Sequence, residues 1–173
     1  MPRRQFTGLG DIRFAVGATA VANIAAPTVA EITAAVRLTP YMTRNGLKRP
    51  QSGNTVDVAD ASSLFNKTGP GTYGGDALEY TGHRDSKGSD DDAWTTLPRG
   101  TIGFWIITDW GWAQAAGTGL GTSGGTPTIG DRCEVWPGTI ISREPADTGE
   151  NESNKFVARS AVTDEPNLDA VVA

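Results

Sequence analysis

Glycine and proline recur along the whole sequence and limit how long any helix can be. The 173 residues include 22 glycines and 10 prolines, well above ordinary usage. Glycine disfavours helix interiors and proline breaks them, whereas both are common in the turns between short strands. A chain of this length can form one domain with its own core. We therefore predict a single, mainly β domain over residues 1–173 with a sandwich or barrel-like sheet.

The apolar pattern predicts where the strands and helices lie. Alternating apolar residues predict half-buried strands at 11–16 and 78–80, and further strands at 132–143 and 154–163. The most apolar run, TIGFWIITDW at 101–110, predicts a central strand that is buried on both sides.

One or two short flanking helices are also expected. Thr28 and Glu31 form a capping-box pattern before Ile32, and Ser89 precedes a second short helix that Pro98 ends. The segments near 44–55 and 113–130 are expected to be mobile loops, and the termini to be flexible.

The stretch GLGTSGG at 119–125 matches the G-x-G-x-x-G fingerprint of dinucleotide-binding proteins. That fingerprint requires a strand before it and a helix beginning at its third glycine. Here Gly125, Pro127 and Gly130 follow, so no helix can begin at Gly124. We interpret the stretch as a loop that joins two strands and expect no nucleotide cofactor.

The sequence contains few parts for an active site. His83 is the only histidine and lies in a turn-rich stretch, so it is expected on the surface. Cys133, the only cysteine, stands beside Asp131 and Glu134, whose charges would raise the pKa of a thiol. The run of three aspartates at 90–92 suits a helix N-terminus better than a calcium loop. We therefore predict no catalytic residues, no metal site, no cofactor and no enzyme activity.

Charge is distributed unevenly along the chain. Residues 1–50 contain seven basic and two acidic residues, net +5, whereas residues 51–173 contain eight basic and eighteen acidic residues, net −10. The overall charge of −5 argues against a protein that binds nucleic acid by neutralising phosphates. No apolar run is long enough for a membrane span or a signal peptide, so we expect a soluble protein made inside the cell, without membrane contact.

Several short motifs together resemble the major tail tube proteins of phages with long flexible tails, especially those of actinobacteria. The motifs, in order, are PTVAEI, GGDALEYTGHRD, DDAWTTLPRGTIGFW, CEVWPG and DEPNLDAV, and they span most of the chain. The resemblance implies a β-sandwich with a flanking helix, and six copies that join into a ring. It further implies that rings stack into a virion tube through which the genome is ejected, after assembly in the host cytoplasm with tape-measure, terminator and distal tail proteins.

A tube that conducts double-stranded DNA should not bind it specifically, so acidic residues are expected on its inner wall. The candidate lumen-facing acids are Glu79, Asp131 and Glu134, because each lies in or at the start of a predicted strand.

Loops that become ordered only against the next ring would delay uncontrolled stacking. The candidate residues for contact between rings are Arg44, Asn45, Lys48, Arg49, Gly119, Gly121 and Gly124. On this hypothesis, deletion of residues 117–125 leaves a folded monomer that fails to polymerise.

A second reading is a virion decoration or carbohydrate-binding β-sandwich, with exposed tryptophans as the sugar platform. A jelly-roll hydrolase is a third. Five tryptophans are present, and those in predicted strands are expected in the core or at a subunit interface.

Overall fold

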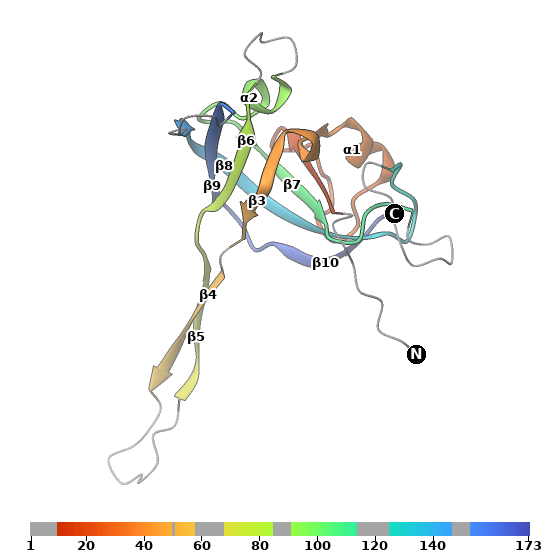
Figure 1. The fold of residues 1–173 in the computed structure, drawn as a ribbon. Coiled ribbons are helices and arrows are strands. Elements are labelled where there is room, and N and C mark those ends of the chain that lie inside the picture. Colours follow the sequence, from red (N-terminus) through yellow and green to blue (C-terminus); the bar gives the residue numbers. More distant parts are fainter. Residues whose placement is uncertain (1–9, 50, 58–67, 85–90, 114–124, 147–152) are drawn as a thin grey trace, which may run out of the picture.

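Antiparallel strands make up most of the structure, a computed structural model that describes residues 10–49, 51–57, 68–84, 91–113, 125–146 and 153–173 (of 51–57 and 68–75, the backbone only). Figure 1 shows the elements in chain order. They are β1 (Asp11–Val16), α1 (Val29–Ala34), β2 (Val36–Arg37), the 3-10 turn η1 (Thr39–Tyr41), β3 (Met42–Lys48), β4 (Gln51–Asp57), β5 (Thr68–Gly75), β6 (Leu78–His83), α2 (Asp92–Thr96), β7 (Ile102–Thr108), β8 (Arg132–Ala146), β9 (Lys155–Val162) and β10 (Asn167–Val171).

Eight of the strands form one open sheet. Its order is β2-β1-β7-β8-β9-β6-β3, and β10 pairs with the first part of β8. All the pairs are antiparallel, and the path does not close on itself. The predicted mainly β class with short flanking helices is thereby confirmed, with a single open sheet at the centre of the described residues.

Strand β7 has apolar clusters on both of its sides, as its unbroken apolar run predicts. Trp105 and Ile107 face one cluster, whereas Ile106 and Phe104 face the other. Trp105 lies opposite both Phe14 on β1 and Trp136 on β8. Its ring centroid is 4.9 Å from that of Phe14, a contact distance typical of packed aromatic pairs.

The first core cluster lies between the sheet and α2. Tyr80 and Phe156 pack beside Trp105, and Ala93 and Leu97 from the α2 region complete the cluster. The second cluster lies on the other face, where Ile32 of α1 packs with Trp112, Cys133, Ala170 and Val172. The sheet is therefore covered on both faces, but by different elements and over different strands.

Each of the two helices has an acidic residue in its first turn. Glu31 N donates to Thr28 Oγ1 (3.2 Å), and Thr28 N donates to Glu31 Oε2 (2.7 Å), which confirms the predicted capping box. Helix α2 begins at Asp92 and has no side-chain cap from Asp91, while the expected cap Ser89 lies outside the described residues. It ends at Thr96, two residues before Pro98.

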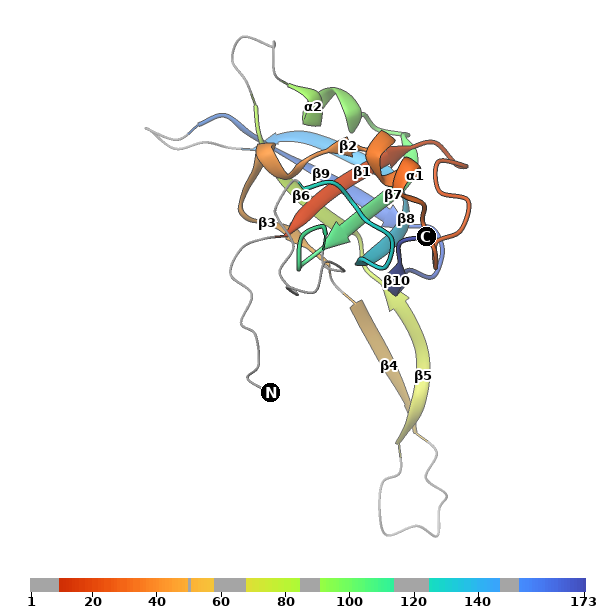
Figure 2. The same cartoon turned by 90° about the vertical axis from the view of Figure 1, so that its right-hand side faces the viewer.

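A two-stranded ribbon extends away from the body. Strands β4 and β5 pair only with each other among the described strands. Figures 1 and 2, at right angles, both show this ribbon pointing away from the eight-stranded sheet. It continues the β3–β6 pair outward, so residues 42–57 and 68–83 form one long hairpin.

Part of the segment expected as a loop near 44–55 lies in strands β3 and β4, which corrects that expectation. The Asn45-Gly46 pair indicated a turn, but it forms an irregularity within β3, where the register shifts between Met42 and Leu47. Asn45 has a left-handed φ of 63°, which a β-bulge uses as readily as a turn. A Cβ on Gly46 would lie 2.4 Å from the Thr81 carbonyl oxygen, so glycine permits the close approach of β6.

Candidate assembly surfaces

Four adjacent strands, β8, β9, β6 and β3, have one buried face and one polar face. Along β6 the burial alternates strictly, with Leu78, Tyr80 and Gly82 buried and the residues between them half-buried. We call the second side the polar face. Its titratable residues are Lys48, Glu79, His83, Glu144, Lys155 and Arg159.

A row of three charged side chains crosses the polar face. Lys48, Glu79 and Arg159 lie opposite one another on β3, β6 and β9. Lys48 Nζ is 2.6 Å from Glu79 Oε1, and Arg159 Nε is 3.3 Å from Glu79 Oε2. The hydrogen bond from Lys48, opposed by partial burial and assisted by Arg159, holds the pKa of Glu79 below its usual value. We call this arrangement the Lys48–Glu79–Arg159 row.

The polar face is not acidic in balance. Among the described residues it contains three cations, Lys48, Lys155 and Arg159, and two acids, Glu79 and Glu144. The acidic excess of residues 51–173 is therefore not concentrated here.

The three candidate lumen-facing acids do not share a face. Glu134 lies opposite Ile107, on the side of the first core cluster, and accepts hydrogen bonds from Arg49 Nη1 and Trp136 Nε1, both at 2.9 Å. Asp131 is fully buried, so its carboxylate cannot line a water-filled bore as expected. Only Glu79 of the three lies on the polar face.

Asp131 holds the flanks of the glycine-rich segment together. Its Oδ2 accepts hydrogen bonds from Ala113 N and Thr128 N, both at 2.8 Å, and from Thr128 Oγ1 at 3.1 Å. Residues on either side of 114–124 are thus joined through one buried carboxylate. The candidates Gly119, Gly121 and Gly124 lie outside the described residues.

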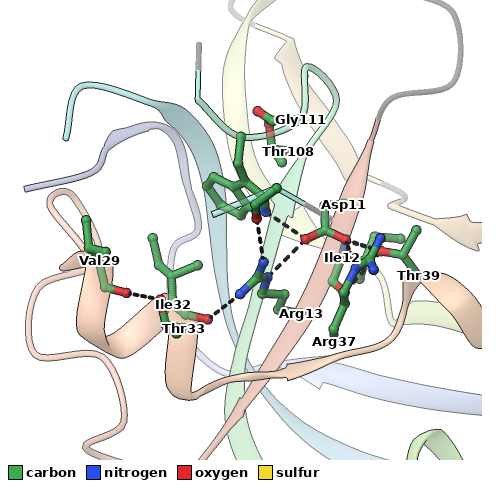
Figure 3. Close-up of polar contacts among 12 residues, drawn as sticks. Asp11, Ile12, Arg13, Val29, Ile32, Thr33, Arg37, Thr39, Thr108 and Gly111 are labelled. Carbon is green, nitrogen blue, oxygen red and sulfur yellow. Dashed lines mark hydrogen bonds and ion pairs between the residues drawn. The ribbon is translucent and has the colours of Figure 1, made fainter. Parts of the chain in front are cut away.

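A second buried carboxylate, Asp11, lies where β1, β2 and η1 meet (Figure 3). Its oxygens accept from Arg13 Nε (3.0 Å), Arg37 Nε (2.8 Å), Thr39 Oγ1 (2.6 Å) and Trp112 Nε1 (2.7 Å). Burial of Asp11 opposes its ionisation, but these four donors outweigh that effect, so its pKa is lowered.

Arg13 extends this network toward the glycine-rich segment. Its Nη1 donates to the Ile32 carbonyl of α1, and its Nη2 donates to the Gly125 carbonyl, each at 3.1 Å. Asp11 and Arg13 were not predicted as functional residues from the sequence. The only available signal was two charged residues at alternate positions of an otherwise apolar strand, on the side expected to face outward.

The candidates for contact between rings have different surroundings. Arg44 and Asn45 are exposed on β3, and Lys48 belongs to the row on the polar face. Arg49 forms ion pairs inside the subunit, at 2.9 Å to Glu134 and 3.2 Å to Asp109. These ion pairs connect the end of β3 to β8 and to the turn after β7.

Two edges of the four-strand segment lack a further strand in the described part of the chain. Strand β3 pairs with β6 alone, and β8 beyond Ile140 pairs with β9 alone. Pro145 lies in this part of β8, as is common for edge strands, because proline has no N–H to donate. Each end of the segment therefore presents backbone that a second chain could contact.

The described residues offer little for catalysis. Burial, with the charges of Asp131 and Glu134, raises the pKa of the Cys133 thiol to about 12, so it is not a reactive nucleophile. His83 Nδ1 lies 2.7 Å from Ser153 Oγ. Among the residues that the structure describes, no group of histidine, cysteine and carboxylate side chains could hold a metal ion. Nor does any described helix have the length and apolar character needed to cross a membrane.

The tryptophans are mostly internal. Trp105, Trp112 and Trp136 are almost fully buried, which leaves no broad aromatic platform of these three for a sugar. Trp94 is flanked by the guanidinium groups of Arg84 and Arg143, at 3.9 and 3.8 Å from its ring centroid. The carbohydrate-binding reading therefore has no specific support from these side chains.

Comparison with known proteins agrees with this architecture. A family model described as phage tail tube protein matches residues 1–173. Among solved structures, a chain of the six-fold symmetrised cryo-EM structure of the anti-feeding prophage baseplate is similar, with a TM-score of 0.54 and 9% sequence identity. The match covers 98% of each chain, so the likeness extends over the whole fold. No curated protein matches the sequence significantly.

Proposed function

Since the chain belongs to the phage tail tube protein family and is a structural component of the tail, we propose that six copies close into a ring. Rings then stack head to tail into a tube that conducts the genome. One observation supports this most strongly: the segment β8-β9-β6-β3 has a buried face, a polar face and an edge without a further strand at each end.

Ring closure would give the backbone at these two sheet edges a neighbouring strand. The β3 edge of one subunit lies beside the distal β8 edge of the next, with the polar face toward the centre. An open sheet edge invites pairing with another chain, and closure of the sheet around a ring removes that exposure. Four strands from each of six subunits give about 24 strands, and at about 4.8 Å spacing they form a perimeter of about 115 Å, or about 37 Å across.

The ribbon of β4 and β5 would be stabilised by a neighbouring subunit. An isolated two-stranded ribbon is only marginally stable in water, because it lacks a third layer to pack against. In the subunit this ribbon points away from the eight-stranded sheet (Figure 2). A head-to-tail contact does not close, so contacts made by such an arm would propagate along a stack.

Tube length and attachment would depend on other tail proteins, and the assembled tube would be part of the virion. The glycine-rich segment remains a candidate for contact between rings, because Asp131 and Arg13 hold its two flanks to the body. Since Arg13 donates to Gly125, a deletion that tests this role should end at Gly124.

Negative-stain electron microscopy of the concentrated, purified full-length chain tests the proposal. We expect rings or tubes with an open bore whose abundance increases with protein concentration. Compact monomers at all concentrations, confirmed by sedimentation, would overturn it.

A further inference from the structure

The polar face presents cations that could bind DNA. The side chains of Lys48 and Arg159 are 68% and 49% exposed, and both lie on the face that borders the bore in the proposed ring. A lysine or arginine on such a wall would attract backbone phosphates and slow a duplex that passes.

Both cations contact one carboxylate. Glu79 is flanked by Lys48 and Arg159 in direct cross-strand register, and its two oxygens are divided between them. Glu79 is only 20% exposed, so it lies lower between the two longer side chains. This position lets it draw each cationic group toward the sheet and away from the bore.

We propose that Glu79 prevents the polar face from binding double-stranded DNA, by occupying the ammonium group of Lys48 and the guanidinium group of Arg159. The proposal rests on the proposed function, in which this face borders the bore. It replaces a wall lined mainly by acids with one in which the cationic groups of Lys48 and Arg159 share a single carboxylate.

Two unpaired cations in each subunit would raise the affinity of a ring for DNA substantially. Each phosphate that a cation neutralises adds about 0.9 to the slope of log affinity against log salt. Two free cations in each of six subunits would give about twelve such contacts in one ring, and six to ten contacts already make affinity change about 10³- to 10⁵-fold between 50 and 200 mM salt. Unpaired, these side chains would hold the duplex.

The test is the variant Glu79→Gln in the full-length chain, which removes the charge and keeps the shape. Binding of a labelled short duplex is followed by fluorescence anisotropy over a series of salt concentrations. We expect the variant to bind the duplex more tightly than the wild type at low salt. The slope of log affinity against log salt concentration should be steeper by about 1.8 per subunit, which is about 0.9 for each of the two cations. This corresponds to about a twelvefold larger loss of affinity between 50 and 200 mM salt.

Two controls separate this effect from a change in overall charge. Glu165 is exposed and forms no ion pair among the described residues, so Glu165→Gln makes the same change of net charge and should leave DNA binding at the wild-type level. In the triple variant Lys48→Gln, Glu79→Gln, Arg159→Gln, the gain in affinity should disappear. An equal gain in Glu165→Gln, or a gain that persists in the triple variant, would overturn the proposal.

A second variant is needed in case Glu79→Gln does not fold. Threonine has high strand propensity, so Glu79→Thr should preserve β6 while it removes the carboxylate, and it should show the same gain in DNA affinity. Unchanged affinity in folded Glu79→Gln and Glu79→Thr would refute the inference.

Electron microscopy of the same preparations separates the two proposals. If wild-type protein fails to form rings, the proposed function fails, whatever the DNA affinity of the variants. If rings form and the variants bind DNA no better than the wild type, only the role of Glu79 fails.

Discussion

The Asp11 carboxylate joins three stretches of the chain, at residues 11–13, 37–39 and 112. It is fully buried and lies between Arg13 and Arg37, with Thr39 and Trp112 as further donors. A buried ion pair contributes little net stability when complete, but removal of one partner leaves a charge buried without compensation.

Asp11→Asn should therefore destabilise the unassembled subunit by about 3 kcal/mol, measured as the free energy of unfolding in urea. Most of the loss is attributed to Arg13, whose side chain is 9% exposed, rather than to the more exposed Arg37. Asp169→Asn, on an exposed position of β10, is the matched control and should change stability by less than about 0.5 kcal/mol. A loss below about 1 kcal/mol in Asp11→Asn would contradict this role.

The same residue predicts a dependence of stability on acid. The pKa of Asp11 is lower in the folded chain than in the unfolded chain, so the folded state binds fewer protons at acidic pH. The contribution of ionised Asp11 to the free energy of unfolding is complete above the pKa of the unfolded chain, about 4. It is lost as the pH falls through the lower pKa that Asp11 has in the folded chain. Urea titrations between about pH 6 and pH 2 should show stability falling with pH, and falling less in Asp11→Asn. Parallel pH curves for the two proteins would exclude the assignment.

Single residues also show why sequence reasoning succeeded in some places and failed in others. Thr28 and Glu31 act within one turn, so their capping box could be predicted from spacing alone. Glu79 and Glu134 both lie in strands, but which face each occupies depends on pairing with strands far along the chain. The charged partners of Asp11 are likewise brought together only by tertiary structure.

At the scale of elements, the ribbon of β4 and β5 points away from the eight-stranded sheet (Figures 1 and 2). Its removal should leave the body folded, because β3 and β6 remain paired at its base. The variant replaces residues 51–75 with a short turn.

We expect the ribbon deletion to retain the near-ultraviolet circular dichroism of the wild type and to unfold within about 1 kcal/mol of it. It should not form tubes at concentrations at which the wild type does. Normal tubes from the deletion would show that the ribbon is not needed for stacking, and loss of the folded signal would show that the body depends on it.

Strand prediction was most successful where burial is local. The run that became β7 is apolar at nearly every position, and burial alternates along β6 as its sequence predicts. The prediction of a half-buried strand at 11–16 was wrong, because Asp11 and Arg13 on the polar side of β1 are buried too. The pairing of β3 with β6 and of β4 with β5 was only partly anticipated, because the glycine-rich and polar sequences of β4 and β5 are typical of loops. A ribbon that packs against another subunit need not show the alternation of a strand that packs on its own core.

At the scale of the whole molecule, the account depends on an open sheet that other copies complete. Composition and motifs predicted the mainly β class and the family, and the family model matches the whole chain. The expected acid-lined bore could not be derived from net charge, since Asp131 is buried and Glu79 is paired with two cations. Net charge is a property of the chain, whereas the charge of a wall depends on strand register.

The most direct measurement of the central claim is a cryo-EM reconstruction of the assembled protein at side-chain resolution. The account predicts a ring in which Glu79 and Arg159 face the bore, with the β3 edge of each subunit beside the distal part of the next subunit's β8. A reconstruction with these side chains on the outer surface, or with both edges exposed to solvent, would contradict it.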